Sequence, residues 1–129
     1  MIDLRSDTVS KPNDSMRKVI QLAEVGDDVI GDDPTVQRLE QLSAQTAGKD
    51  AALYVPSGTM GNLIALLVHC QTRKAAIVGS ESHILWHEGL GATALGGIHL
   101  ISIENESDGK LSDADLDKFA QDKVADPAV

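Results

Sequence analysis

The amino-acid sequence predicts an α/β fold with a mainly parallel sheet and flanking helices. Short apolar runs of strand length alternate with segments whose apolar residues recur every three or four positions, which is the pattern of strands separated by helices. Glycine, proline and capping residues stand between these segments. With 129 residues, 42% of them apolar and 24% charged, the chain has the composition of an ordered globular protein.

A polar arm and a first helix are expected at the start of the chain. Residues 1–12 carry no apolar periodicity and are interpreted as an ordered arm or loop. Asn13 provides a helix cap, and apolar residues at helical spacing follow it, so a helix is expected over about residues 14–24. Gly26 is expected to end this helix.

A loop and a second helix are expected next. Residues 26–33 contain four aspartates and two glycines, and this combination of like charge and backbone freedom favours a loop. Asp33 followed by Pro34 is a strong helix start, because the carboxylate caps free amides and proline suits the first helical position. The second helix is expected to end at Gly48.

The middle of the chain is expected to form a βαβ unit. The apolar run at residues 51–55 predicts a buried strand, which breaks at residues 56–58. Apolar residues at helical spacing follow over residues 60–70, and a second strand is expected at residues 75–79. A strand, a helix and a strand in this order imply parallel pairing through a crossover.

The last quarter of the chain is expected to add a strand and a closing helix. Residues 86–95 are interrupted by glycine but favour a helical conformation, and residues 98–103 predict another strand. A start that resembles a capping box at residues 112–115 predicts an amphipathic helix that includes Leu116 and Phe119.

Charge and composition exclude several classes of function. Lysine and arginine number 11 against 20 acidic residues, which gives a formal charge of −9, and three aromatic residues are present, so a nucleic-acid partner is disfavoured. The longest apolar run, residues 63–68, is far shorter than the roughly 20 residues that span a bilayer, so no membrane partner is expected. The first residues do not resemble a signal peptide, and the lone Cys70 favours a reducing, cytoplasmic location.

A candidate anion site lies where the strand at residues 51–55 gives way to the following helix. Free amides at a helix N-terminus attract negative charge, Gly58 would let a phosphate approach the main chain, and the hydroxyls of Ser57 and Thr59 add donors. Neither a P-loop lysine nor a G-x-G-x-x-G motif is present. A tight turn and helix cap explains the segment equally well.

A second candidate site contains two histidines and a glutamate. His83 follows the expected strand at residues 75–79, and ligand sites in parallel sheets lie beyond the carboxyl ends of the strands. In a helix, His83 and His87 would share a face beside Glu88, which suggests a metal-dependent hydrolase. A zincin helix requires glutamate directly after its first histidine, where this chain has Ile84, so no metal site is expected.

The polar arm is a third candidate. Residues 3–8 are dense in hydrogen-bonding groups, and such a terminal segment frays unless something holds it. A local ion pair between Arg5 and Asp7 is the simpler explanation, whereas a ligand contacting the arm is the functional one.

Five ordered blocks of the sequence resemble the low-specificity L-threonine aldolases. They lie at residues 3–9, 23–29, 31–36, 55–62 and 82–84. The resemblance covers nearly the whole chain and is weakest after residue 104. It implies that the chain is the N-terminal part of the large domain of a fold type I enzyme that uses pyridoxal 5'-phosphate.

The resemblance also implies a division of this incomplete large domain. Residues 1–12 would form the N-terminal arm, residues 13–48 a helical segment, and residues 49–129 the start of the α/β sheet domain. The implied activity is that of a lyase, which cleaves L-threonine or L-allo-threonine to glycine and acetaldehyde in a retro-aldol reaction. Such an enzyme would serve threonine catabolism and glycine biosynthesis as a cytoplasmic homo-oligomer, either a dimer or a homotetramer.

Five residues acquire roles from the resemblance. Ser57, Gly58 and Thr59 correspond to the cofactor phosphate site. His83 corresponds to the histidine that stacks on the pyridine ring, close enough to the substrate β-hydroxyl to act as a general base. Ser6 corresponds to a residue near the substrate carboxylate.

The sequence also departs from the family pattern. Ile30 stands where the family commonly has an aromatic residue, and His87 stands where tyrosine or phenylalanine is common. None of the lysines lies in the motif of the Schiff-base lysine, so this part of the chain alone is expected to be inactive. The alternative function is a stand-alone α/β module that binds a phosphorylated metabolite at Ser57, Gly58 and Thr59 without covalent chemistry.

Overall fold

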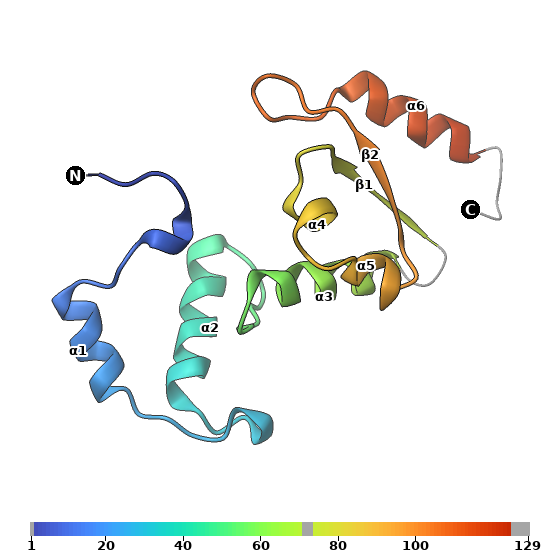
Figure 1. The fold of residues 1–129 in the computed structure, drawn as a ribbon. Coiled ribbons are helices and arrows are strands. Elements are labelled where there is room, and N and C mark those ends of the chain that lie inside the picture. Colours follow the sequence, from blue (N-terminus) through green and yellow to red (C-terminus); the bar gives the residue numbers. More distant parts are fainter. Residues whose placement is uncertain (1, 71–73, 125–129) are drawn as a thin grey trace. The chain divides into compact units, whose positions relative to one another are not determined.

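The computed structural model describes residues 2–70 and 74–124, and the chain divides into two compact units between Tyr54 and Val55 (Figure 1). Each unit is considered by itself. The first contains the helices α1 and α2 and two short 3-10 turns, whereas the second contains the sheet and the helices α3 to α6.

Helix α1 (Asp14–Leu22) confirms the first expected helix, although it ends at Leu22 before the expected position. The Asn13 side chain caps it by accepting a hydrogen bond from the amide of Met16 at 2.9 Å. No residue of α1 is buried. Its apolar side chains, which include Val19 and Ile20, are therefore exposed within this unit.

The expected loop at residues 26–33 is largely confirmed, with one turn of 3-10 helix inside it. The turn spans Asp28–Ile30, and Asp27 caps it through the amide of Val29 at 2.9 Å. A second 3-10 turn, Asp7–Val9, lies in the N-terminal arm. Ile30 is exposed at the end of its turn.

Asp33 begins helix α2 (Pro34–Ala47) as the sequence predicts. The buried carboxylate accepts hydrogen bonds from the amides of Thr35 and Val36 at 2.9 Å each and from the amide of Gly26 at 3.0 Å. These hydrogen bonds hold the pKa of Asp33 below its usual range. The one from the Gly26 amide contributes most, and those from the amides of α2 add to it. Gly48 closes the helix in the left-handed conformation.

We expect Asp33→Asn to destabilise the protein at pH 7, because asparagine has a single acceptor oxygen for three amides. Since the folded-state pKa is lowered, the carboxylate stabilises the native state above its unfolded pKa, and this contribution is lost as the pH falls through the folded value. The difference in free energy of unfolding between wild type and variant, the stability gap, should therefore become smaller below about pH 4. Urea unfolding followed by circular dichroism at pH 7 and pH 3, with the exposed Asp50→Asn as control, measures this gap. An equal gap at both pH values would contradict the prediction.

The second unit contains a two-stranded parallel sheet. Strand β1 (Ala75–Gly79) pairs with β2 (His99–Ile103), from Ala75 opposite His99 to Gly79 opposite Ile103. Helix α3 (Gly58–Cys70) precedes β1, the short helices α4 (His83–Trp86) and α5 (Gly91–Ala94) connect the two strands, and α6 (Asp113–Val124) follows (Figure 1). The α/β class with a parallel sheet is thus confirmed.

The prediction of a strand at residues 51–55 was wrong. The described residues form no strand there, and Leu53 and Tyr54 are exposed. The amide of Tyr54 donates to the Glu40 carboxylate at 2.7 Å, so a side chain of α2 takes a donor that a sheet would use. The crossover therefore joins β1 to β2 through α4 and α5, and not residues 51–55 to β1 through α3.

The helix expected at residues 86–95 is divided in two. Gly89 and Leu90 both adopt positive φ angles, of 61° and 60°, which no α-helix accommodates. The core of this unit lies where α5 meets the sheet, and Ile98, which immediately precedes β2, is completely buried. No helix in the described part of the chain combines the length and apolar character needed to cross a membrane.

Candidate functional site

The first turn of α3 carries the predicted anion site. The Ser57 side chain caps this turn by accepting a hydrogen bond from the amide of Met60 at 3.1 Å. Among the described residues, no acceptor contacts the amides of Gly58 and Thr59. A Cβ atom built on Gly58 would have no neighbour within 4 Å. The turn therefore offers two amide donors and unobstructed access to the backbone, which suits a phosphate.

His83 lies at the start of α4, beyond the carboxyl end of β1, as the sequence predicts. Its Nδ1 atom is 2.9 Å from Oε1 of Glu88. The His83 side chain is 64% exposed, whereas the Glu88 side chain is only 5% exposed. The imidazole thus has one nitrogen engaged by a buried carboxylate, and the ring remains accessible.

Asn62 connects this histidine to α3. The Asn62 side-chain nitrogen donates to the same Glu88 oxygen at 2.7 Å. Asn62 is the fifth residue of α3, so its backbone lies about 6 Å along the helix axis from Gly58. The shared carboxylate therefore holds His83 beside the first turns of the helix that begins with the candidate anion site.

The local backbone explains how Glu88 reaches His83. Helix α4 ends at Trp86, and His87 forms its C-cap. Glu88 directly follows this cap, and its side chain reaches back to the imidazole of His83 at the first residue of α4. The Trp86 indole donates a hydrogen bond to the carbonyl of Ser80 and thereby holds α4 against the end of β1.

The structure brings His83, His87 and Glu88 together without forming a metal site. The two imidazole rings have centroids 5.2 Å apart and an interplanar angle of 50°. The Nδ1 atom of His83 is engaged by Glu88. Among the side chains that the structure describes, no group of three or more histidines, cysteines or carboxylates could hold a metal ion. The metal-dependent hydrolase therefore gains no support.

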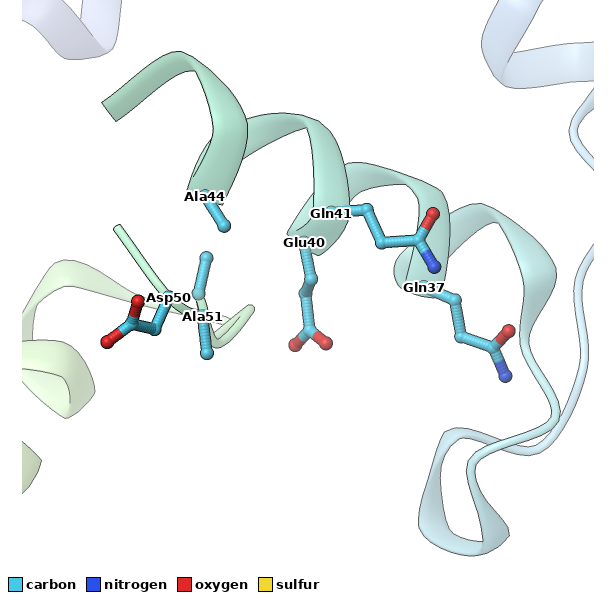
Figure 2. A pocket seen from close by; sticks show the side chains of 7 residues that line it. Gln37, Glu40, Gln41, Ala44, Asp50 and Ala51 are labelled. Carbon is cyan, nitrogen blue, oxygen red and sulfur yellow. The ribbon is translucent and has the colours of Figure 1, made fainter. Parts of the chain in front are cut away.

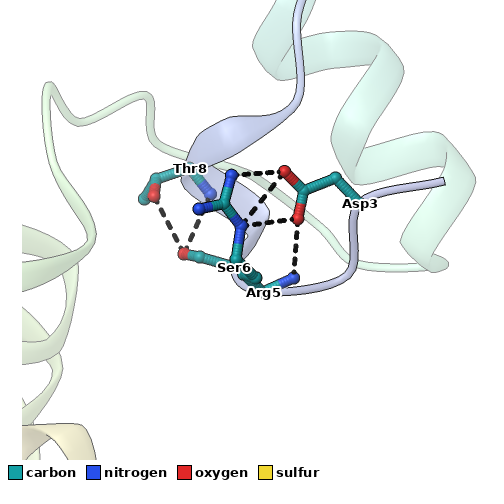
Figure 3. A network of polar contacts seen from close by, with 4 residues as sticks. All are labelled: Asp3, Arg5, Ser6 and Thr8. Carbon is teal, nitrogen blue, oxygen red and sulfur yellow. Dashed lines mark hydrogen bonds and ion pairs between the residues drawn. The ribbon is translucent and has the colours of Figure 1, made fainter. Parts of the chain in front are cut away.

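Ser6 lies in the N-terminal arm, in the first unit, and is described there (Figure 3). Its hydroxyl is 2.8 Å from the Thr8 hydroxyl and accepts a hydrogen bond from the Thr8 amide at 3.2 Å. Arg5 forms an ion pair with Asp3 at 2.6 Å, which lowers the pKa of Asp3 and raises that of Arg5. The expected partner of Arg5, the Asp7 carboxylate, lies outside the described side chains.

A separate cavity of about 290 Å³ lies in the first unit between α2 and residues 50–52 (Figure 2). Its polar lining includes the carboxylates of Glu40 and Asp50, which would repel a phosphate or a substrate carboxylate. It contains none of the predicted site residues. The cavity is therefore not a candidate for the anion site.

Sequence reasoning missed the contact between Asn62 and Glu88 and weighed Glu88 only as a metal ligand, which it did not favour. Helical spacing pairs His83 with His87, whereas the hydrogen bond joins residues five positions apart. The sequence carries no signal for this contact, because it depends on α4 ending at Trp86, one residue before the His87 cap.

Comparison with known proteins shows what this chain is similar to. The model of the family named beta-eliminating lyase matches residues 3–128. The probable low-specificity L-threonine aldolase 2 of Arabidopsis thaliana is 54% identical over 111 residues, which make up 85% of this chain and 31% of that protein. The low specificity L-threonine aldolase of Escherichia coli K12 is 48% identical over 120 residues, 93% of this chain and 35% of that protein. The chain thus spans about a third of the length of these curated relatives.

Proposed function

Because the chain belongs to the beta-eliminating lyase family, we propose that it forms the first part of an L-threonine aldolase that depends on pyridoxal 5'-phosphate. The protein would cleave L-threonine or L-allo-threonine to glycine and acetaldehyde in threonine catabolism and glycine biosynthesis. The names of its relatives in Arabidopsis thaliana and Escherichia coli support this activity. We further propose a cytoplasmic homo-oligomer, a dimer or a tetramer.

The division of the chain is part of the same proposal. Residues 1–129 would belong to the large domain of a fold type I enzyme, with an arm at 1–12, a helical segment at 13–48 and the start of the sheet domain at 49–129. The parallel pairing of β1 and β2, with helices in the crossover between them, supports this assignment.

The observation that carries the proposal is the position of His83 beside the start of α3. The Glu88 carboxylate connects His83 to Asn62 of that helix. A phosphate donor site and an exposed imidazole in the same unit fit a cofactor that has an anionic group at one end and a flat ring at the other. The free amides and the open space at Gly58 suit the phosphate end.

Each predicted residue receives a role in this proposal. Ser57, Gly58 and Thr59 would hold the phosphate through two amides and two hydroxyls. His83 would cover one face of the cofactor ring, and its Nε2 atom would accept the proton of the substrate β-hydroxyl. Ser6 would bind near the substrate carboxylate. When bound, pyridoxal phosphate supplies the electron sink that makes the Cα–Cβ bond breakable. We assign the Schiff-base lysine to none of the lysines in this chain.

Joining residues 1–129 to the remaining two thirds of the E. coli K12 aldolase tests the activity. We expect the chimaera to release acetaldehyde from L-threonine, measured by NADH oxidation with alcohol dehydrogenase. The E. coli segment alone is the control and should be inactive. A folded chimaera that binds pyridoxal phosphate but releases no acetaldehyde would contradict the proposal and favour the non-covalent module.

Gly58→Ala is expected to weaken cofactor binding without destabilising the fold. The methyl group meets no protein atom within 4 Å, and alanine is the better helix former. The added methyl group would, however, occupy the space through which the phosphate approaches the amides of Gly58 and Thr59. We expect the dissociation constant for pyridoxal phosphate to rise by at least about tenfold, the cost of one hydrogen bond to a charged group. Gly91→Ala at the start of α5 is the matched control, and equal affinity in both variants would contradict the prediction.

A further inference from the structure

We propose that Glu88 is a positioning residue that keeps the hydrogen of neutral His83 on Nδ1, and that Asn62 holds Glu88 in place for this task. The effect on the tautomer follows from the contacts of these side chains alone. Its consequence for turnover rests on the proposed function.

The hydrogen bond between Glu88 and His83 determines which imidazole nitrogen carries the hydrogen. An ionised carboxylate only accepts hydrogen bonds, so the Nδ1 atom, 2.9 Å from Oε1, must be the donor. In the neutral ring the other nitrogen, Nε2, then carries the lone pair. His83 is 64% exposed, so this lone pair belongs to an accessible ring.

Asn62 holds the carboxylate where it acts. The Glu88 side chain is 5% exposed, and a buried carboxylate needs hydrogen-bond donors to offset the loss of water. Two donors converge on its Oε1 atom, the Asn62 amide at 2.7 Å and the His83 ring at 2.9 Å. Because Asn62 is part of α3, the orientation of the His83 ring is tied to the helix that begins at Ser57.

This arrangement suits a proton acceptor at Nε2. In cleavage of a β-hydroxy amino acid, Nε2 would receive the hydroxyl proton and the O–H electron pair would become the carbonyl bond of acetaldehyde. The electron pair of the broken Cα–Cβ bond would remain with the glycine carbon, which takes a proton from water, and the imidazolium would then return its proton to water. Glu88 would stabilise the transient imidazolium without becoming protonated. With the opposite tautomer, Nε2 would carry a hydrogen and could not accept the proton.

Nitrogen NMR of the complete protein without cofactor tests the tautomer. The protein is labelled with ¹⁵N-histidine at a pH where His83 is neutral, and its signals are assigned by their loss in His83→Gln. We expect the Nε2 signal of wild-type His83 at the position of an unprotonated nitrogen. In Glu88→Ala this signal should move toward that of a protonated nitrogen, whereas Glu81→Ala, which removes an exposed carboxylate two residues before His83, should leave it unchanged.

Two further variants keep the inference testable if Glu88→Ala does not fold. Glu88→Gln retains an acceptor oxygen and should preserve most of the Nδ1–H form, and Asn62→Ala should produce a mixture of tautomers. A wild-type His83 with its hydrogen on Nε2, or a tautomer that none of the Glu88 and Asn62 variants changes, would overturn the proposal.

Kinetics separate this inference from the proposed function. If wild type cleaves L-threonine, Glu88→Ala should lower kcat by about 10–100-fold with little change in KM, the size of loss found when the hydrogen-bond partner of a metal-binding histidine is removed. Glu88→Gln should recover part of this loss. If wild type shows no cleavage but the tautomer responds as expected, the proposed function fails and the role of Glu88 stands.

Discussion

Replacing His83 with alanine is expected to lower kcat for L-threonine cleavage by about 10²–10⁴-fold, the usual contribution of a positioned general base. The exposed ring lies beyond the carboxyl end of β1 and is held by Glu88, so the variant loses both the proton acceptor and the surface that would cover the cofactor ring. Acetaldehyde release by the complete protein measures the loss of turnover, and the absorbance of bound pyridoxal phosphate measures the loss of affinity.

His83→Phe separates the two roles. Phenylalanine keeps a flat ring but has no nitrogen, so cofactor affinity should be largely retained while turnover stays low. The exposed His69→Ala on α3 is the control and should behave as wild type. Unchanged turnover and cofactor affinity in both His83 variants would remove this residue from the mechanism.

The largest effect on stability is expected from Ile98→Ala. Ile98 is completely buried, next to the start of β2, and its backbone amide bonds to the carbonyl of Ala92 in α5 at 3.0 Å. Removing its side chain leaves a cavity in the core of the second unit, at a cost of about 2–5 kcal/mol in the free energy of unfolding.

Urea unfolding of the complete protein measures this cost. Leu95→Ala is the matched control, because Leu95 is 76% exposed and its truncation leaves no cavity. The expected loss for Ile98→Ala is a large share of a typical total stability of about 5–15 kcal/mol. A loss no greater than that of Leu95→Ala would show that Ile98 does not hold this core together.

The elements that the sequence predicted well are those whose signals are local. The start of α2 follows from Asp33 and Pro34, and its end follows from Gly48, because a cap or a left-handed glycine acts within one helical turn. Strands β1 and β2 were likewise recognisable, because each is a short apolar run and no other strand lies between them in the sequence.

The strand expected at residues 51–55 failed because a strand depends on a partner that the local pattern does not specify. The apolar run is present, but the Tyr54 amide bonds to Glu40, which lies 14 residues earlier in the sequence. A side-chain acceptor from another element leaves no trace in the hydrophobic periodicity of the run.

The candidate site shows the same limit. His83 and the Ser57 turn could be recognised from the sequence because each lies at the end or start of a regular element. The contact between Asn62 and Glu88 joins residues 26 positions apart, in two different segments, and no spacing rule predicts it. The partners that orient a functional side chain are therefore harder to infer than the side chain itself.

The crossover between β1 and β2 has a consequence for the order of folding. Ala75 pairs with His99, so the first register pair closes a segment whose ends are 24 positions apart (99 − 75), and the last pair needs no residue beyond Ile103. Parallel pairing across such a crossover is slow, because the entropy cost of closing the loop comes before the contacts that offset it. His83 and Glu88 both lie inside that loop and only five positions apart, so their contact is local and does not require the strands to be paired.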